Sequence, residues 1–441
     1  MPVPPRIARL ALIPGFLLAL ALAAPAAAGP YIVVEADSGK VLAQHDAGRQ
    51  WYPASVTKLM TVYLTFRALR AGKVKLDTPL TVSETAHAQP PSKMGLQVGA
   101  QVTVDNALKM LMVKSANDVA VVLAEGVGGS LSAFVKAMND AADDLGMNGT
   151  QFRNPNGLPD EEQVTTARDM AVLARALIRE YPEHEMLFRI PAIQYGRRVM
   201  RNHNRLIDRF PGIDGMKTGF ICSSGFNVVA TAKRGDKHLI VVVFGARSSL
   251  SRAEDAARLF ERGFGGPLAL ANLFAGERPT LEQVANVAVG PVDMREEMCD
   301  RRRRRGKKPL VETDLDEDAD DPETKALLNN GPKQTLLIDL PPSMPPIRVW
   351  AGLKQPAETK ATETRSRKTR VSRTKKTKAT ADVKPKAKAT EAKSTEAKAK
   401  PKTVTGKAKT KESPKPATTA PEPKPAPTRV STPAPAPRPG G

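Results

Sequence analysis

Residues 354–441 contain no aromatic side chain and consist largely of Lys, Ala, Thr and Pro. Such a segment buries too little apolar surface to offset the conformational entropy lost on ordering. We therefore expect a disordered tail over 354–441, so any folded domain must lie in the first 353 residues. No other feature of the sequence constrains the fold as strongly.

The tail also carries most of the positive charge. It holds 24 Lys and Arg against 7 Asp and Glu, which is +17 of the formal net charge of +21. It has no aromatic residue to stack on bases, so we do not expect nucleic acid as a partner. A solvated spacer in weak contact with an anionic cell envelope is favoured. The non-enzymatic alternative is an envelope or polyanion-binding protein that acts through this tail.

The N-terminal 28 residues have the pattern of a secretory signal peptide. Arg6 and Arg9 precede the apolar run Leu10–Ala24, and Ala26–Ala28 offers small residues for cleavage. The alternative is an uncleaved membrane anchor, but Pro14 interrupts the run, which is short for a span. We expect cleavage near Ala28 and export to the periplasm or cell envelope.

The stretch Tyr52–Lys58 places a serine and a lysine at the start of a predicted helix. Apolar residues follow at helical spacing, at Leu59, Val62, Tyr63, Phe66 and Leu69. Because three residues are about one turn, Lys58 projects over the same face as Ser55. An unprotonated amine there can take the hydroxyl proton and make Ser55 a nucleophile. Taken alone, such a pair is more often found on a solvated surface.

The order of helical and strand patterns predicts the fold class. Two apolar runs, Tyr31–Ala36 and Val41–Gln44, flank a turn signal and predict a hairpin. Helical patterns fill the middle of the chain, and β-rich runs return at Phe226–Ala232 and Leu239–Phe244. A last helix is expected from about Arg252 to Phe264. We predict an α+β domain over residues 29–265, with a mixed antiparallel sheet packed against helices.

Two more short motifs carry polar side chains at breaks in the pattern. Ser115-Ala116-Asn117 separates two apolar helical runs, and Lys217-Thr218-Gly219 precedes a β-rich run. The ordinary interpretations are a helix cap and a turn. Together with Ser55 and Lys58, in this order, they match penicillin-recognising serine enzymes.

The residues around these motifs narrow the resemblance. The chain resembles the low-molecular-weight penicillin-binding proteins that act as serine-type D-alanyl-D-alanine carboxypeptidases, over roughly Pro30 to Phe264. The stretches that carry the resemblance are Tyr52–Lys58, Ser115–Asp118, Asn154–Leu158, Thr166–Asp169 and Gly215–Gly219. It implies removal of the last D-Ala from peptidoglycan pentapeptide stems, covalent binding of β-lactam antibiotics, and no cofactor.

The resemblance also implies a role for each residue. Ser55 attacks the carbonyl of the penultimate D-Ala with Lys58 as general base. Ser115 relays the proton to the leaving amine, and Asn117 binds the substrate amide.

The strand-start motif Lys217-Thr218-Gly219 belongs to the substrate-binding set. Lys217 and Thr218 hold the terminal carboxylate. The backbone N–H groups of Ser55 and Phe220 form the oxyanion hole. Arg252 could also bind carboxylate, but an exposed arginine at a helix start is an equally good interpretation.

Two departures from the family pattern leave alternatives open. Ala116 replaces a common glycine without consequence, whereas Ile221 stands where a threonine is common, at a corner that contacts substrate. A β-lactamase shares the motifs but needs a carboxylate to activate water, and Glu161 and Glu162 lie only in a loop. A D,D-endopeptidase would use the same residues.

Cys222 and Cys299 are the only cysteines, and an exported chain can join them. The bridge would close a loop of roughly 75 residues and stabilise by about 4 kcal/mol. The alternative is a buried apolar Cys222 and a free, exposed Cys299. With few histidines and two distant cysteines, we expect no metal site.

Residues 266–353 give a weak pattern and are expected to form a short, poorly defined extension. Thr335–Leu340 and Ile347–Trp350 are the best candidates for strands there. Neither a second all-β domain nor an amphipathic membrane anchor is expected in this part of the chain.

Overall fold

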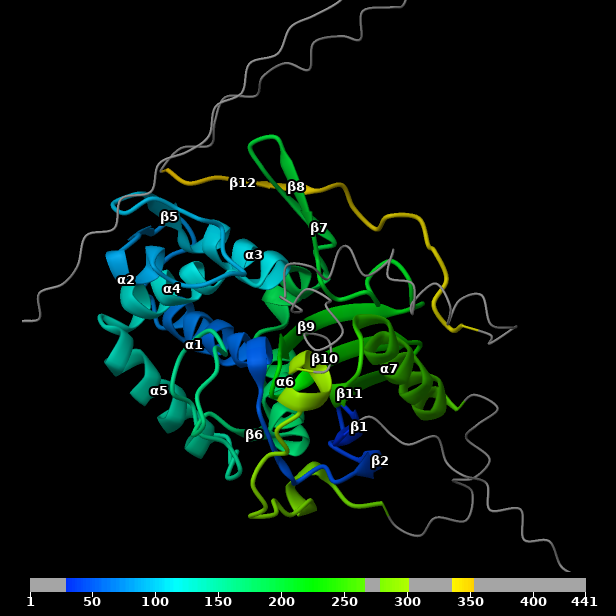
Figure 1. Ribbon diagram of the computed structural model, residues 1–441. Coiled ribbons are helices and arrows are strands. Elements are labelled where there is room, and N and C mark those ends of the chain that lie inside the picture. The colour runs from blue at the N-terminus through cyan, green and yellow to red at the C-terminus, as the bar shows by residue number, and fades with distance from the viewer. Residues whose placement is uncertain (1–28, 266–277, 301–334, 353–441) are drawn as a thin grey trace, which may run out of the picture. The chain divides into compact units, whose positions relative to one another are not determined.

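The computed structural model describes residues 29–265, 278–300 and 335–352 (Figure 1). The chain divides into two units, residues 1–361 and 362–441, and every described residue belongs to the first. The expected signal peptide and the expected basic tail lie outside the described residues.

A five-stranded antiparallel sheet forms the centre of this unit, in the order β2-β1-β11-β10-β9. The strands are β1 (Tyr31–Glu35), β2 (Val41–His45), β9 (Ile213–Ile221), β10 (Gly225–Arg234) and β11 (Lys237–Ala246). The predicted hairpin is β1–β2, and the two predicted β-rich runs lie within β10 and β11. The expected α+β class is therefore confirmed.

Both faces of the sheet are covered. Side chains alternate across each strand, so Val241 and Val243 of β11 pack in one cluster while Ile240 and Val242 pack in another. The first cluster includes α7 (Ser249–Phe264), and the second includes the remaining long helices. Burial on both faces explains why β10 and β11 read as nearly continuous apolar runs.

The helices opposite α7 carry most of the catalytic motifs. They are α1 (Lys58–Arg70), α2 (Glu84–His87), α3 (Val104–Lys114), α4 (Asn117–Gly128), α5 (Leu131–Asp144) and α6 (Ala167–Glu180). The short helical turns are η1 (Ala54–Thr57), η2 (Pro182–Arg189), η4 (Leu281–Gln283) and η5 (Glu296–Asp300). Helix α7 begins at Ser249, three residues before the expected start, because Ser248 and Ser251 form a capping box.

Three small sheets complete the described fold. They pair β3 (Gln50–Trp51) with β6 (Thr165–Thr166), β4 (Pro79–Thr81) with β5 (Gln101–Thr103), and β12 (Ile347–Val349) with β7 (Ala192–Tyr195) and β8 (Arg198–Arg201). The prediction of a strand near Ile347 is confirmed. The prediction over Thr335–Leu340 is wrong: there the backbone donates to the loop carbonyls of Asp208 and Arg209 but joins no ladder.

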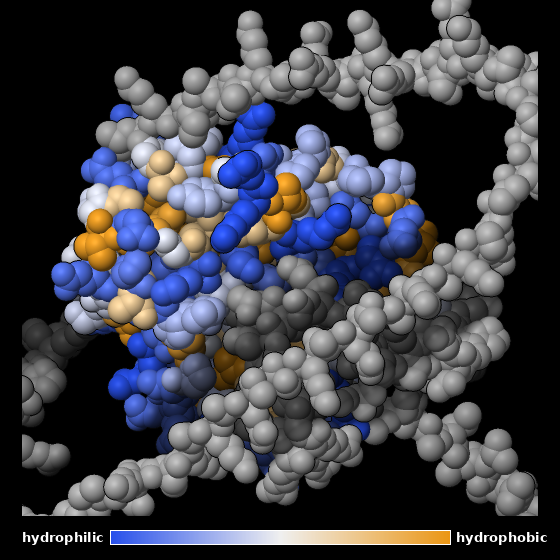
Figure 2. Space-filling view, turned by 45° about the horizontal axis from the view of Figure 1, so that its top comes forward, coloured by the Kyte–Doolittle hydropathy of each residue, from blue (hydrophilic) through white to orange (hydrophobic). Residues whose placement is uncertain are grey.

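The surface of the described residues shows no large apolar face in the view drawn. Figure 2 turns forward the side that carries β5, β12 and the β7–β8 hairpin, and shows hydrophobic residues in small groups among hydrophilic ones. Across residues 29–265, 278–300 and 335–352, no single helix has the length and hydropathy to cross a membrane; only α4 and α5 together, bent by 85°, meet that test.

Candidate active site

Ser55 and Lys58 lie where η1 leads into α1. Both are buried, with 4% and 0% of their surface exposed. Lys58 Nζ lies 2.8 Å from Ser55 Oγ, so the spacing read from the sequence does bring the amine onto the hydroxyl. Burial of both groups keeps water from competing for this contact.

Lys58 has two further partners that orient its amine. Nζ donates to Asn117 Oδ1 at 2.8 Å and to the backbone carbonyl of Asn156. Asn156 belongs to the loop of the Asn-Pro-Asn-Gly-Leu stretch, and Thr61 of α1 bonds the neighbouring Pro155 carbonyl at 2.7 Å. This loop therefore holds Lys58 in place. Its sequence carried the family resemblance, but no role for Asn156 was predicted.

The break between α3 and α4 carries Ser115 and Asn117, of which Asn117 contacts Lys58. Ser115 ends α3 with φ 60° and ψ 33°, a left-handed conformation that is uncommon for serine, and it is fully buried. Asn117 begins α4, and its backbone N–H and side-chain amide donate to the carbonyls of Ser92 and Pro90 at 2.7 and 3.0 Å. A strained residue held by its surroundings is typical of functional sites.

Strand β9 forms the opposite wall and carries Lys217, Thr218 and Gly219, of which the first two are 1% and 2% exposed. A Cβ at Gly219 would lie 2.7 Å from the backbone N of Ser55, so only glycine lets β9 approach η1 this closely. β9 is the last strand of its sheet, and no other strand of the described residues pairs with its outer edge. Such an edge can accept an extended peptide.

A cavity of about 340 Å³ opens beside Ser55. Its lining residues are Ser55, Pro91, Asn117, Gly157, Leu158, Pro159, Phe220, Ile221, Cys222, Ser223, Arg295, Cys299 and Asp300. A larger cavity, about 690 Å³, lies between β2 and residues 279–289 and contains none of the predicted site residues. Among the described residues no group of three or more His, Cys, Asp or Glu side chains could hold a metal ion.

Arg252 is buried, with 1% of its surface exposed, so its interpretation as an exposed arginine is wrong. It lies in the first turn of α7, where the helix packs under β10, and donates to the carbonyls of Asn227 and His203 at 3.4 and 3.0 Å. It does not line the cavity beside Ser55. Burial, and next the charges of Lys217 and other cations, lowers the pKa of His203 to about 3. The imidazole is therefore neutral at ordinary pH.

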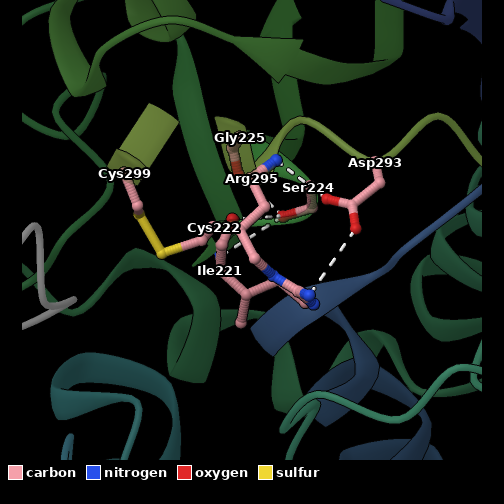
Figure 3. The surroundings of a disulfide bond; sticks show 7 residues. All are labelled: Ile221, Cys222, Ser224, Gly225, Asp293, Arg295 and Cys299. Atoms are coloured by element: carbon pink, nitrogen blue, oxygen red, sulfur yellow. Dashed lines mark hydrogen bonds and ion pairs between the residues drawn. A yellow bond between two sulfur atoms is a disulfide. The ribbon is translucent and has the colours of Figure 1, made fainter. Parts of the chain in front are cut away.

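Cys222 and Cys299 form a disulfide, with their Cα atoms 5.7 Å apart (Figure 3). Cys222 follows β9, and Cys299 is 2% exposed in η5, so the interpretation of a free, exposed Cys299 is wrong. The bridge brings a segment from beyond α7 to the cavity, where Arg295 and Asp300 join the lining. Their part in the site could not be predicted, because nothing in the sequence around them is patterned.

Asn227 of β10 is a further residue that the sequence analysis missed. Its side-chain amide donates to the carbonyls of Tyr52 and Pro53 at 2.9 and 3.2 Å, and its oxygen accepts from the Gly245 N–H at 3.1 Å. It ties the turn before Ser55 to the central sheet. A buried asparagine within an otherwise apolar run was the available signal.

Comparison with known proteins extends these observations. A family model described as D-alanyl-D-alanine carboxypeptidase matches residues 20–248. The D-alanyl-D-alanine carboxypeptidase DacC of Escherichia coli is 38% identical over 241 residues, or 53% of this chain and 60% of that protein. The D-alanyl-D-alanine endopeptidase of Pseudomonas aeruginosa is 33% identical over 252 residues, or 54% and 78%.

Among solved structures, penicillin binding protein 5 from Haemophilus influenzae is similar, with a TM-score of 0.52 and 33% identity, over 54% of this chain and 70% of that one. The match to DacC spans 60% of that protein's length. The similarity therefore concerns the domain that holds Ser55.

Proposed function

Because the chain belongs to the D-alanyl-D-alanine carboxypeptidase family, we propose that it is a serine-type enzyme that removes the terminal D-alanine from peptidoglycan pentapeptide stems. The observation that carries this proposal is the 2.8 Å contact between Lys58 Nζ and Ser55 Oγ in a buried site. A buried amine on a serine hydroxyl is the arrangement that acyl transfer without histidine requires. The signal pattern at the N-terminus supports action in the periplasm or cell envelope.

In the acylation step, Ser55 Oγ attacks the carbonyl carbon of the penultimate D-alanine while unprotonated Lys58 accepts the hydroxyl proton. The carbonyl becomes an oxyanion, for which the backbone N–H groups of Ser55 and Phe220 are the candidate donors. The close approach that Gly219 permits supports this pairing, because it brings β9 to the backbone of Ser55.

Collapse of the oxyanion breaks the bond to the terminal D-alanine. Its amine needs a proton, which Ser115 would pass on from Lys58. Lys217 and Thr218 would hold the carboxylate of the departing residue, and Asn117 the amide on the acyl side. Water then attacks the ester on Ser55, with the proton transfers reversed, and releases the shortened stem.

A D,D-endopeptidase is the second candidate, favoured by the similarity to the Pseudomonas aeruginosa endopeptidase over 78% of that protein. The same residues would cut a cross-link instead of a terminal residue. A β-lactamase is less well supported. Glu161 and Glu162 are exposed, Glu162 pairs with Arg153 at 3.2 Å, and neither lines the cavity beside Ser55.

The test uses the purified full chain with a synthetic pentapeptide stem and with penicillin. We expect release of D-alanine and a lasting penicillin adduct that mass spectrometry locates on Ser55. Ser55→Ala should lose the adduct and lower turnover by at least about 10⁴-fold, because it removes the proposed nucleophile. An adduct elsewhere, or one undiminished in Ser55→Ala, would contradict the proposal. Rapid hydrolysis of penicillin without a lasting adduct would instead indicate a β-lactamase.

A further inference from the structure

Residues Asp293–Asp300, here called the 293–300 segment, lie beside the active site although they are outside the residues that the family model matches. Three polar or covalent contacts hold them there. The disulfide joins Cys299 to Cys222, the Met294 N–H donates to the Ser223 carbonyl at 3.0 Å, and Glu297 pairs with Arg247 at 3.0 Å. Two of these contacts attach the segment to the turn that follows β9.

Apolar packing fixes the segment further. Met298 and Cys299 are 4% and 2% exposed and share a hydrophobic cluster with Phe220, Phe226 and Ala246. Phe220 is the residue of β9 next to Gly219. The 293–300 segment is thus packed against the strand that forms one wall of the site, which gives its side chains defined positions.

The cavity beside Ser55 extends toward this segment. Its lining includes Phe220–Ser223 but neither Lys217 nor Thr218. If Lys217 and Thr218 hold the terminal carboxylate, the leaving residue lies at one end of this stretch of β9, and the acyl part of the peptide continues toward the other. The cavity is therefore the acyl-side subsite, and Arg295 and Asp300 line it.

Arg295 is the one cationic side chain in the lining of this cavity. Figure 3 shows it extending past Ile221, with its guanidinium beside the Asp293 carboxylate. The pair is long, at 3.8 Å, and both side chains are about half exposed, at 58% and 47%. Such pairs contribute little, so a substrate carboxylate can replace Asp293 and bind the guanidinium by two parallel hydrogen bonds.

We propose that the 293–300 segment is a specificity element of the acyl-side subsite, in which Arg295 binds a carboxylate on the side chain of the residue that precedes D-Ala-D-Ala. This inference rests on the proposed function and names the class of peptide that the site prefers. Ile221, which stands where the family commonly has a hydroxyl, is apolar, so the polar contact at this corner comes from Arg295 instead.

Acidic neighbours limit the size of the preference. The Asp293 carboxylate lies 3.8 Å from the Arg295 guanidinium, and the Asp300 side chain lines the same cavity. An incoming anion must therefore compete with these groups for Arg295.

The experiment compares two N-acetylated tripeptides that end in D-Ala-D-Ala and begin with L-glutamate or with L-glutamine. They differ by one carboxylate, so the ratio of their kcat/KM values isolates its recognition. We expect the wild-type ratio to exceed that of Arg295→Gln by about tenfold, the usual effect of one charge-assisted hydrogen bond. Arg295→Lys should give an intermediate ratio, because lysine keeps the charge but cannot form two parallel hydrogen bonds to one carboxylate.

Arg258→Gln is the matched control. Arg258 is 51% exposed on α7, pairs with Glu254 and Asp255, and is absent from the cavity lining, so its removal should leave the ratio at the wild-type value. All variants retain Arg301–Arg305, so the charge of that run is constant. Equal ratios in wild type and Arg295→Gln, with both still acylated at Ser55 by penicillin, would overturn the role proposed for Arg295 and leave the proposed function in place. A wild type without acylation or D-alanine release would overturn the proposed function, and the subsite with it.

Discussion

Two parts of the active site are built in opposite ways: the floor, which is Ser55, Lys58 and Asn117, and the rim, which is the 293–300 segment. On the floor, Ser55, Lys58 and Asn117 are at most 4% exposed and joined by hydrogen bonds of 2.8 Å. On the rim, Arg295 is 58% exposed and its ion pair with Asp293 spans 3.8 Å. The floor lies within the residues that the family model matches, and the 293–300 segment lies outside them.

The contrast follows from what each part must do. Proton transfer needs fixed distances and little water, so its groups are buried and fully bonded. Selecting a substrate needs a side chain that can exchange one partner for another. Such a side chain stays exposed, while the backbone of its segment is held in place. The disulfide holds the backbone by joining Cys299 of the segment to Cys222 after β9.

Lys58→Arg tests whether the floor acts through proton transfer or only through charge. Arginine stays positive but does not release its proton at working pH, so it cannot be the base. We expect the rate of acylation by fluorescent penicillin to fall by roughly 10²–10⁴-fold, with the fold retained by circular dichroism.

The control for Lys58→Arg is Lys109→Arg. Lys109 lies on α3 and pairs with Asp105, away from the cavity. Its replacement should leave acylation unchanged. Acylation of Lys58→Arg near the wild-type rate would remove Lys58 from the role of base and weaken the contrast between floor and rim.

The double variant Cys222→Ser/Cys299→Ser tests whether the rim depends on its covalent tie. The bridge closes a separation of 77 residues, so its loss should lower the free energy of unfolding by up to about 4 kcal/mol in guanidinium denaturation. Acylation of Ser55 should persist, whereas the preference for the acidic tripeptide should fall toward that of Arg295→Gln.

A thiol titration of the denatured, unreduced wild type checks whether the bridge between Cys222 and Cys299 forms in solution. No reactive thiol is expected. Two reactive thiols would mean that the bridge does not form in solution, and the rim would then have to be held by packing alone.

His203 tests how dry the interior beside Arg252 is. Its pKa is about 3 in the fold and about 6.5 when unfolded, so between these pH values only the unfolded chain binds the proton. Stability from this group is complete above pH 6.5 and falls by roughly 1.4 kcal/mol per pH unit as the pH drops below it. Urea denaturation from pH 7 to 5 should show this slope in wild type and its loss in His203→Asn.

The exposed His45 provides the comparison, since His45→Asn should keep the wild-type slope. An equal slope in wild type and His203→Asn would mean that the imidazole is hydrated or protonated in the fold. The surroundings of His203 would then be wetter than its burial indicates.

The elements that sequence patterns predicted well are those in which a single face or run is buried. Helix α1 follows from the spacing of Leu59, Val62 and Phe66, and β10 and β11 follow from runs of apolar, β-branched residues. The 3.6-residue period also predicted the contact of Lys58 with Ser55, because both lie on one helical turn.

The elements that were missed depend on distant partners. The β7–β8 hairpin has a mixed sequence and was not predicted. Its strand β7 pairs with β12, about 150 residues away in the chain, as at Ile347 and Ile193. Arg252 was predicted either to bind a carboxylate or to lie exposed at a helix start, yet it is buried and donates to two backbone carbonyls within the core. Asn156 orients Lys58 through its backbone, which no side-chain pattern can indicate.

The sequence by itself determined the chemistry proposed for the floor, because Ser55, Lys58 and the polar groups at two breaks come in motifs whose local geometry is set by helix and strand periods. Only the tertiary structure decided the rim. Whether Cys299 reaches Cys222, and whether Arg295 then meets the cavity, depends on where the chain returns after α7. That return is set by packing of Met298 and Cys299 against Phe220 and Phe226, a contact between segments more than 70 residues apart that has no local signature.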